Sequence, residues 1–224
     1  MSEAGLKTQC ERCGTCCLQG GPALHLEDAK LLQNKIIGRE SLITIRKGEP
    51  VIPPGKSSPV WSTTEIIKLK GKPSEWTCIF YDRRNSSCLI YQYRPVECVL
   101  LKCWDTAELQ GIAGRNLLDR SDIIGKDEPI MQHINAFEKE CDLGIIAGMN
   151  LDRPDTLNKE SLAELNELVN RDLQLRSRAQ KDLNLSVDLE LFYFGRPVFI
   201  ILSQFSLLPR EVNGKIHMIR SPSQ

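Results

Sequence analysis

Four cysteines within eight residues constrain this chain more than any other feature of its sequence. The stretch CERCGTCC places thiols at Cys10, Cys13 and Cys16, with Cys17 directly after them. A C-x-x-C turn brings two sulfurs to one side, where a soft cation can hold them as thiolates. Two such steps in succession predict that three sulfurs converge on one point and that a further ligand comes from elsewhere.

The loop that carries these cysteines has to turn sharply. Gly14 lies at its centre, and glycine tolerates the positive φ that such a turn requires. Backbone N–H groups of the loop are expected to point at the sulfurs and stabilise their negative charge. Because adjacent side chains rarely reach one small centre, Cys16 and Cys17 are predicted to point apart. Cys17 then either serves a second site or is a packed free thiol.

A second group of cysteines lies between residues 78 and 103 and can supply the remaining ligands. A helix is expected from Val96, after Pro95, and it places Cys98 in its first turn. Cys103 is more than one turn further on, so Cys98 is the stronger ligand candidate. The candidate metal ligands of both groups together are Cys10, Cys13, Cys16, Cys17, Cys78, Cys88, Cys98 and Cys103.

The two motifs resemble the YkgJ-type cysteine-cluster family, described as zinc- or iron-chelating proteins. C-x-x-C-G-x-C-C is followed by a lone cysteine and then by C-x-I-Y-x-x-R-P-x-x-C, which ends at Cys98. The resemblance covers about residues 8 to 105 and implies a metal or iron–sulfur domain. A flagellin lysine N-methylase branch carries a similar cluster. This sequence has no Gly-rich methyl-donor loop, so methyl transfer is a less favoured activity than an iron–sulfur oxidoreductase.

Composition excludes several other classes of protein. Basic and acidic residues number 29 each, so the formal net charge is zero and no electrostatic footprint for nucleic acid is present. The polar N-terminus and the lack of an apolar run of about 18 residues predict no secretory signal, no membrane association and a cytoplasmic location. The nine cysteines are then reduced, and clustered reduced cysteines are more often metal ligands than disulfides. With nucleic acid and membrane excluded, the expected partner is a redox or other protein, which the sequence does not identify.

The pattern of short segments predicts an α+β fold in two parts. Residues 1–145 are expected to form a small cysteine-rich metal-binding domain of short strands and helices. Residues 155–224 are expected to form a C-terminal helix plus short strands packed on the first domain. In the first part, strands over 65–70 and 76–81 are predicted to pair as a hairpin that carries Cys78 inward.

Other segments give more local expectations. Residues 24–37 are predicted to form a helix, and residues 187–193 alternate as a strand would. The sequence from Ser161 to Glu164 is a capping box that predicts a helix start. An apolar face that runs from Ile130 to Cys141 places this last cysteine in the core, outside the site. Asn213-Gly214 predicts a terminal hairpin, with Val212 and Ile216 at its flanks.

Two further residues are candidates near the metal. Arg94 is a predicted cofactor-binding residue, because a guanidinium beside several thiolates offsets their charge and donates hydrogen bonds. Its alternative role is an ion pair at the helix start with Glu97 or Asp105. His25 could complete a site of three thiolates and one imidazole, although a lone histidine near a helix start is more often structural.

Two classes of function compete on this pattern. The favoured one is an iron–sulfur protein, with a 4Fe-4S cluster held by Cys10, Cys13, Cys16 and one downstream cysteine, in electron transfer or an oxidoreductase reaction. The alternative is a structural or scaffolding protein with one or more zinc sites of four cysteines. Zinc modules usually contain two compact pairs, whereas Cys88 and Cys98 are ten residues apart, which favours the cluster.

Overall fold

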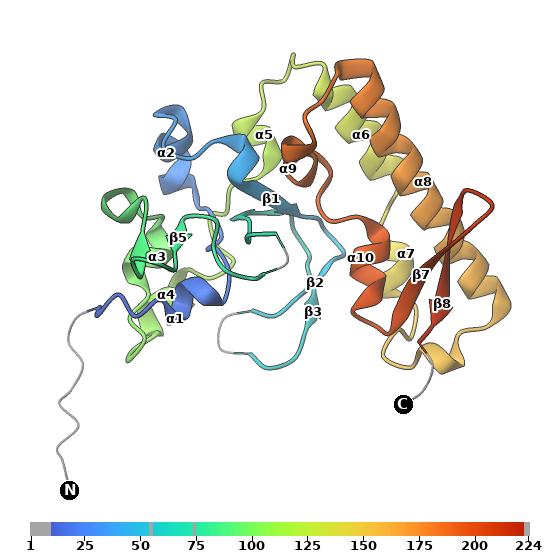
Figure 1. Ribbon diagram of the computed structural model, residues 1–224, viewed down its shortest axis with the longest axis horizontal. Helices are drawn as coiled ribbons and strands as arrows, with labels where there is room; N and C mark the ends of the chain where they lie inside the picture. The colour runs from blue at the N-terminus through green and yellow to red at the C-terminus, as the bar shows by residue number, and fades with distance from the viewer. Residues whose placement is uncertain (1–9, 54–55, 74, 222–224) are drawn as a thin grey trace, which may run out of the picture.

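Helices and four short antiparallel strand pairs make up the computed structural model, which describes residues 10–53, 56–73 and 75–221 (Figure 1). The predicted α+β class is therefore confirmed. The helices are α1 (Thr15–Leu18), α2 (Ala29–Gln33), α3 (Val96–Leu100), α4 (Ala107–Ile112), α5 (Arg120–Ile123), α6 (Ile130–Glu140), α7 (Gly144–Ala147), α8 (Lys159–Leu183), α9 (Glu190–Phe194) and α10 (Val198–Ser203). The strands are β1 (Leu42–Ile45), β2 (Pro50–Val51), β3 (Val60–Trp61), β4 (Ile66–Leu69), β5 (Tyr81–Asp82), β6 (Ser87–Cys88), β7 (Leu207–Val212) and β8 (Lys215–Arg220).

The pair of β1 and β4 lies at the centre of the fold. Its register joins Leu42 to Leu69 and Ile45 to Ile66, and it buries Ile67 completely. The predicted hairpin of residues 65–70 with 76–81 is wrong, because β4 takes its partner from β1. Residues 76–81 meet the end of β4 through the bridge from Gly71 to Cys78 and through two backbone hydrogen bonds beside it, from Ile79 to Lys70 and from Lys72 to Thr77. This contact is too short to form a strand pair, and Cys78 is buried as predicted.

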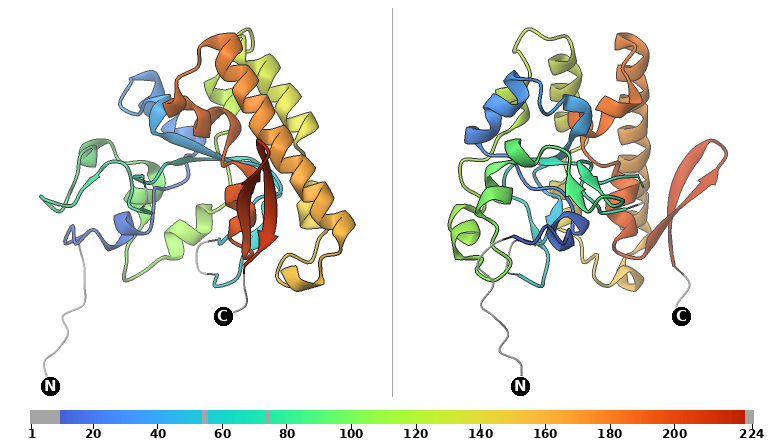
Figure 2. Two further views of the ribbon diagram at one scale, coloured as in Figure 1. Left: turned by 45° about the vertical axis from the view of Figure 1, so that its right-hand side comes forward. Right: turned by 60° about the vertical axis from the view of Figure 1, so that its left-hand side comes forward.

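The apolar faces of two helices form the other half of the core. The face predicted on α6 is confirmed, since Ile130, Ile134 and Phe137 are buried and Cys141 is fully buried after its end. α8 packs along α6, as both views of Figure 2 show. It begins one turn before the predicted capping box, because the side chain of Asn158 accepts a hydrogen bond from the backbone N–H of Ser161.

Two local predictions are wrong for identifiable reasons. Residues 187–193 form a 3-10 turn and then α9, not a strand. Three consecutive aromatic residues of α9, from Phe192 to Phe194, are buried between β1 and α6, and a strand with one buried face cannot bury them all. The helix predicted over 24–37 ends at Gln33, because Lys35 has a φ of 56°. The carbonyl of Leu31 then accepts hydrogen bonds from the backbone N–H groups of Ile36 and Ile37.

Buried ion pairs connect the central strands to the helices. The carboxylate of Glu138 on α6 accepts hydrogen bonds from Arg46 and Arg120, whose side chains are 1% and 5% exposed. Arg120 also pairs with Glu65. Breaking one partner of such a network leaves a buried charge unpaired, which is strongly destabilising. Glu138 therefore fixes α6 against β1 and α5.

The C-terminal hairpin predicted at Asn213-Gly214 is confirmed. β7 and β8 pair from Leu207 with Arg220 to Val212 with Lys215, and the two turn residues have φ values of 52° and 74°. These positive angles match the type I′ turn that joins twisted strands.

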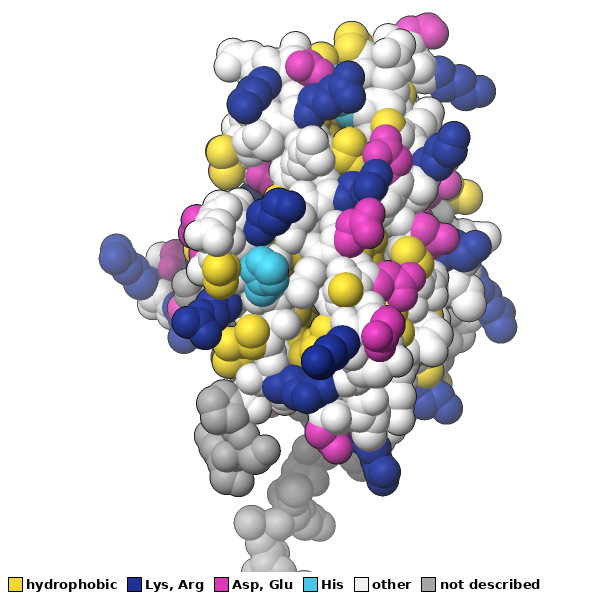
Figure 3. Space-filling view, turned by 90° about the vertical axis from the view of Figure 1, so that its right-hand side faces the viewer, with side chains coloured by type: hydrophobic (Ala, Val, Ile, Leu, Met, Phe, Trp, Pro, Cys, Tyr) yellow, Lys and Arg dark blue, Asp and Glu magenta, His cyan; other side chains and the backbone are white. Residues whose placement is uncertain are grey.

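On the face that Figure 3 shows, basic side chains are interspersed with acidic ones.

The buried apolar side chains form one continuous hydrophobic core, whose members come from positions between Leu24 and Met218. The division of the chain into 1–145 and 155–224 stays a prediction. Among the described residues, no helix combines the length and the apolar character needed to cross a membrane.

Candidate metal centre

The loop that begins at Cys10 turns at Gly14, as predicted. Gly14 has a φ of 79°, and a Cβ atom there would collide with the ring and hydroxyl of Tyr81. The loop thus lies directly against β5 and leads into α1. The backbone N–H of Arg12 donates to the Sγ of Cys10 at 3.4 Å, the kind of N–H to sulfur contact expected for this loop.

Two connections hold the downstream cysteines next to this loop. The backbone N–H of Cys78 donates to the carbonyl of Cys17 at 2.7 Å. Cys88 on β6 pairs with Tyr81 on β5, the residue that contacts Gly14. Chain segments about 60 residues apart are therefore joined by backbone hydrogen bonds before any metal is considered.

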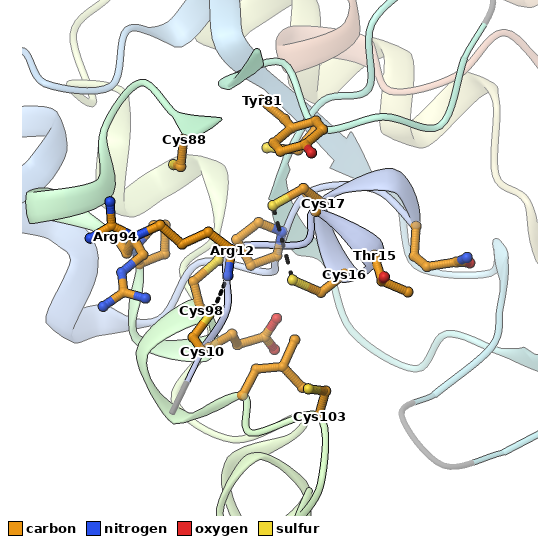
Figure 4. A pocket seen from close by; sticks show the side chains of 18 of the residues that line it. Cys10, Arg12, Thr15, Cys16, Cys17, Tyr81, Cys88, Arg94, Cys98 and Cys103 are labelled. Atoms are coloured by element: carbon orange, nitrogen blue, oxygen red, sulfur yellow. Dashed lines mark hydrogen bonds between the residues drawn. The ribbon is translucent and has the colours of Figure 1, made fainter. Parts of the chain in front are cut away.

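One cavity of about 920 Å³ is formed between the loop, β5, β6 and α3 (Figure 4). All eight cysteines proposed as ligands line it: Cys10, Cys13, Cys16, Cys17, Cys78, Cys88, Cys98 and Cys103. Their exposure differs, with Cys78 buried, Cys17, Cys88 and Cys98 half-buried and the others exposed. Cys141 does not line the cavity and is fully buried in the core, as predicted.

Cys16 and Cys17 do not point apart, so that prediction is wrong. Their Sγ atoms are 4.0 Å apart, because the first turn of α1 places both side chains on the cavity side (Figure 4). A hydrogen bond from Cys17, opposed in part by burial, lowers the pKa of the Cys16 thiol to about 6. The same hydrogen bond, together with burial, raises the pKa of Cys17. Cys16 is therefore the more acidic member of this pair.

The downstream thiols are electrostatically connected to this pair. Burial, followed by the neighbouring thiols Cys78, Cys16 and Cys88, raises the pKa of Cys98. Burial also raises the pKa of Cys78, with smaller contributions from Cys88 and Cys16. Several thiolates around one cavity repel one another, and a bound cation removes that repulsion. The thiols that line this cavity are therefore suited to a shared cation.

The donor set fits zinc or an iron–sulfur centre. It consists of soft thiolate sulfurs, which both of these groups prefer. Within the described residues, no three His, Cys, Asp or Glu side chains already stand in ligating geometry. Metal binding therefore requires the sulfurs to move toward one another, and four of the eight are on exposed positions of the rim where side chains can rotate.

Arg94 and His25 occupy different places. The guanidinium of Arg94 lines the cavity and lies 3.9 Å from the centroid of the Tyr91 ring. It also contributes to the lowered pKa of Cys16. The alternative ion pair with Glu97 or Asp105 is absent among the described residues, since Glu97 accepts from the backbone of Ala23 and lies 3.3 Å from His25. His25 is 2% exposed and lies outside the cysteine cavity, in a structural position.

Arg12 is a residue at the cavity that the sequence did not predict. Its guanidinium lies 4.1 Å from the centroid of Tyr91, so two arginines contact one aromatic ring at the cavity. Nothing in the sequence singles out Arg12 among the charged residues between the cysteines. The contact of Tyr91 with both guanidiniums depends on the fold of the loop.

A cavity bordered by eight thiols defines a cysteine-cluster metal-binding protein. The chain belongs to the CxxCxxCC family, described as "Putative zinc- or iron-chelating domain", whose model matches residues 9–142. This confirms the resemblance noted in the sequence and supports metal binding by the chain. Comparison with curated proteins and with solved structures gave no match.

Proposed function

We propose that the protein holds an iron–sulfur cluster, of the 4Fe-4S type, and serves in electron transfer or an oxidoreductase reaction. The observation that supports this most is the convergence of eight thiols from three chain segments on one cavity of about 920 Å³. A single zinc ion with four Zn–S bonds of about 2.3 Å fills only a small part of such a space. A polynuclear centre uses more of the thiols and more of the volume.

The chain's own residues have separate tasks in this proposal. Cys10, Cys13 and Cys16 are ligands together with one of Cys78, Cys88 or Cys98, and the remaining thiols are available to a second centre. When bound, the cluster supplies one-electron chemistry. Arg94 offsets the negative charge of the thiolates, which affects a reduction potential.

The second candidate is a zinc site of four thiolates with a structural or scaffolding role. The hydrogen bond from the backbone of Cys78 to Cys17 supports it, because zinc at this place would fasten the N-terminal loop to β5 and β6. Zinc binding would then add directly to the stability of the fold.

Anaerobic purification followed by metal and acid-labile sulfide analysis tests the proposal. We expect brown protein in which iron and sulfide occur in equal amounts and dithionite bleaches the visible absorbance. Colourless protein with stoichiometric zinc and no sulfide would replace the first candidate with the second.

A further inference from the structure

The cavity is larger than a metal centre needs, and its size and apolar lining resemble those of small-molecule binding sites. Ligand pockets have volumes of about 300–1,000 Å³ and apolar walls with few polar groups. This cavity has a volume of about 920 Å³. Its apolar wall includes Phe80, Ile90, Val99, Leu101 and Trp104.

The charged side chains at the cavity are unevenly matched. Lys102 pairs with Glu108, and Glu97 is engaged by the backbone of Ala23 and by His25. Among the described residues, neither Arg12 nor Arg94 forms an ion pair with a carboxylate. Glu11 is a further carboxylate at this cavity, and within the described part of the chain it forms no ion pair with either arginine. Among the described residues, the two guanidiniums are therefore the cationic groups at this cavity that pair with no carboxylate.

Both guanidiniums lie against the ring of Tyr91, at 4.1 Å for Arg12 and 3.9 Å for Arg94. Stacking uses the face of a guanidinium and leaves the N–H groups at its edge available to an acceptor. The Nε of Arg94 is buried and has no hydrogen-bond partner among the described residues. A fixed, partly desolvated cation with unused donors is the usual recognition group for a carboxylate or phosphate.

We propose that this cavity binds an organic anion beside the metal centre, with its acidic group at Arg94 and Arg12 and its apolar body against the Val99 and Trp104 wall. The inference rests on the proposed function in one respect, because it places the ligand next to the proposed metal. It names the ligand class as an apolar molecule with one carboxylate or similar oxyanion.

A pair of probes that differ in charge tests the proposal. 2-Naphthoate and 2-naphthamide have the same ring and differ in the acidic group, and equilibrium dialysis of the full, metal-containing chain measures the affinity of each. We expect 2-naphthoate to bind at one site per chain. Since charged hydrogen bonds are the stronger ones, Arg94→Gln and Arg12→Gln should each weaken 2-naphthoate about tenfold and change 2-naphthamide less than about twofold.

Matched variants make the result specific. Arg84→Gln removes an exposed arginine of the β5–β6 turn and should leave both affinities unchanged. Arg94→Lys keeps a charge without the planar fork and should recover part of the affinity for 2-naphthoate. Equal affinities of the two probes, or arginine variants that affect neither or both alike, would overturn the proposal.

Metal analysis of each protein separates this inference from the proposed function. If wild-type protein contains no metal but still distinguishes the probes through Arg94, the proposed function fails and the anion site stands. If metal is bound and the probes are not distinguished, the anion site fails and the arginines serve only to offset thiolate charge.

Discussion

At the scale of single residues, Gly14 determines whether the cysteine loop can reach the cavity. Its φ of 79° disfavours other residues by roughly 1–2 kcal/mol, and a Cβ would also collide with Tyr81. We expect Gly14→Ala to destabilise the protein by more than this amount and to reduce its metal content. Thermal unfolding and metal analysis measure the two effects.

Gly111 provides the matched control for this prediction. It lies within α4, and nothing stands within 4 Å of the position its Cβ would take. Gly111→Ala should therefore stabilise the protein by about 0.5–1 kcal/mol, because glycine weakens a helix interior by that amount. Wild-type stability and metal content in Gly14→Ala would contradict the role given to this glycine.

Two cysteines allow a second comparison at the same scale. Cys13 lines the cavity, whereas Cys141 is fully buried in the core and burial raises its pKa to about 12. We expect Cys13→Ser to lose metal and to lower the melting temperature, because metal binding contributes to folding. Cys141→Ala should lose about 1 kcal/mol of packing and keep full metal content. The reverse pattern of metal contents would exclude Cys13 as a ligand.

Residue types and spacing were sufficient to predict some of this site. Cysteine spacing identified the residues around the cavity, and the sharp turn they need predicted the positive φ of Gly14. The contact between the Cys16 and Cys17 sulfurs was not predictable, since it depends on the short helix α1. The same holds for Arg12, whose place beside Tyr91 is fixed by tertiary contacts alone.

At the scale of elements, Glu138 connects α6 with β1 and α5 and makes stability depend on pH. Burial raises its pKa, but Arg46 and Arg120 outweigh that effect, so the net pKa is lowered. The stabilisation is complete above the unfolded-state pKa of about 4.3 and is lost as pH falls through the lower native-state value.

Glu138→Gln removes this contribution. We expect a loss of about 2 kcal/mol at neutral pH, below the full range for a buried pair because the Glu138 side chain is 35% exposed. The difference in urea-unfolding free energy between wild type and variant should shrink below about pH 4.3. A difference that is independent of pH would show that the carboxylate charge is not the cause.

Elements with strong local signals were predictable, and those decided by long-range pairing were not. The helical period of α6 and the Asn213-Gly214 turn depend on neighbouring residues, and both predictions held. β4 pairs with β1, whose paired residues lie 21 to 27 positions earlier, and a local hairpin was the wrong alternative. The segment of α9 was predicted to be a strand because its apolar residues alternate over seven positions. That pattern assumes one buried face, whereas three consecutive residues of α9 are buried.

At the scale of the whole molecule, metal removal should affect the cysteine segments more than the helices α6 and α8. The cysteine segments 10–18 and 78–103 have few buried residues, whereas α6 and α8 share a continuous core. We expect chelation to increase amide hydrogen exchange in these segments and to leave α8 protected. Uniform loss of protection would mean that metal supports the entire fold, and no change would mean that it supports none of it.

In the proposed function, sulfurs from residues 10–17 and from residues 78–103 share one inorganic centre. Alkylation of each thiol, followed by mass spectrometry with and without chelation, is the decisive experiment. Cys10, Cys13 and Cys16 are exposed in the structure, so protection in the metal-bound protein requires ligation. We expect these three to become reactive together with Cys98 when metal is removed, while buried Cys141 stays inert. Equal reactivity of Cys10, Cys13 and Cys16 before and after chelation would contradict it.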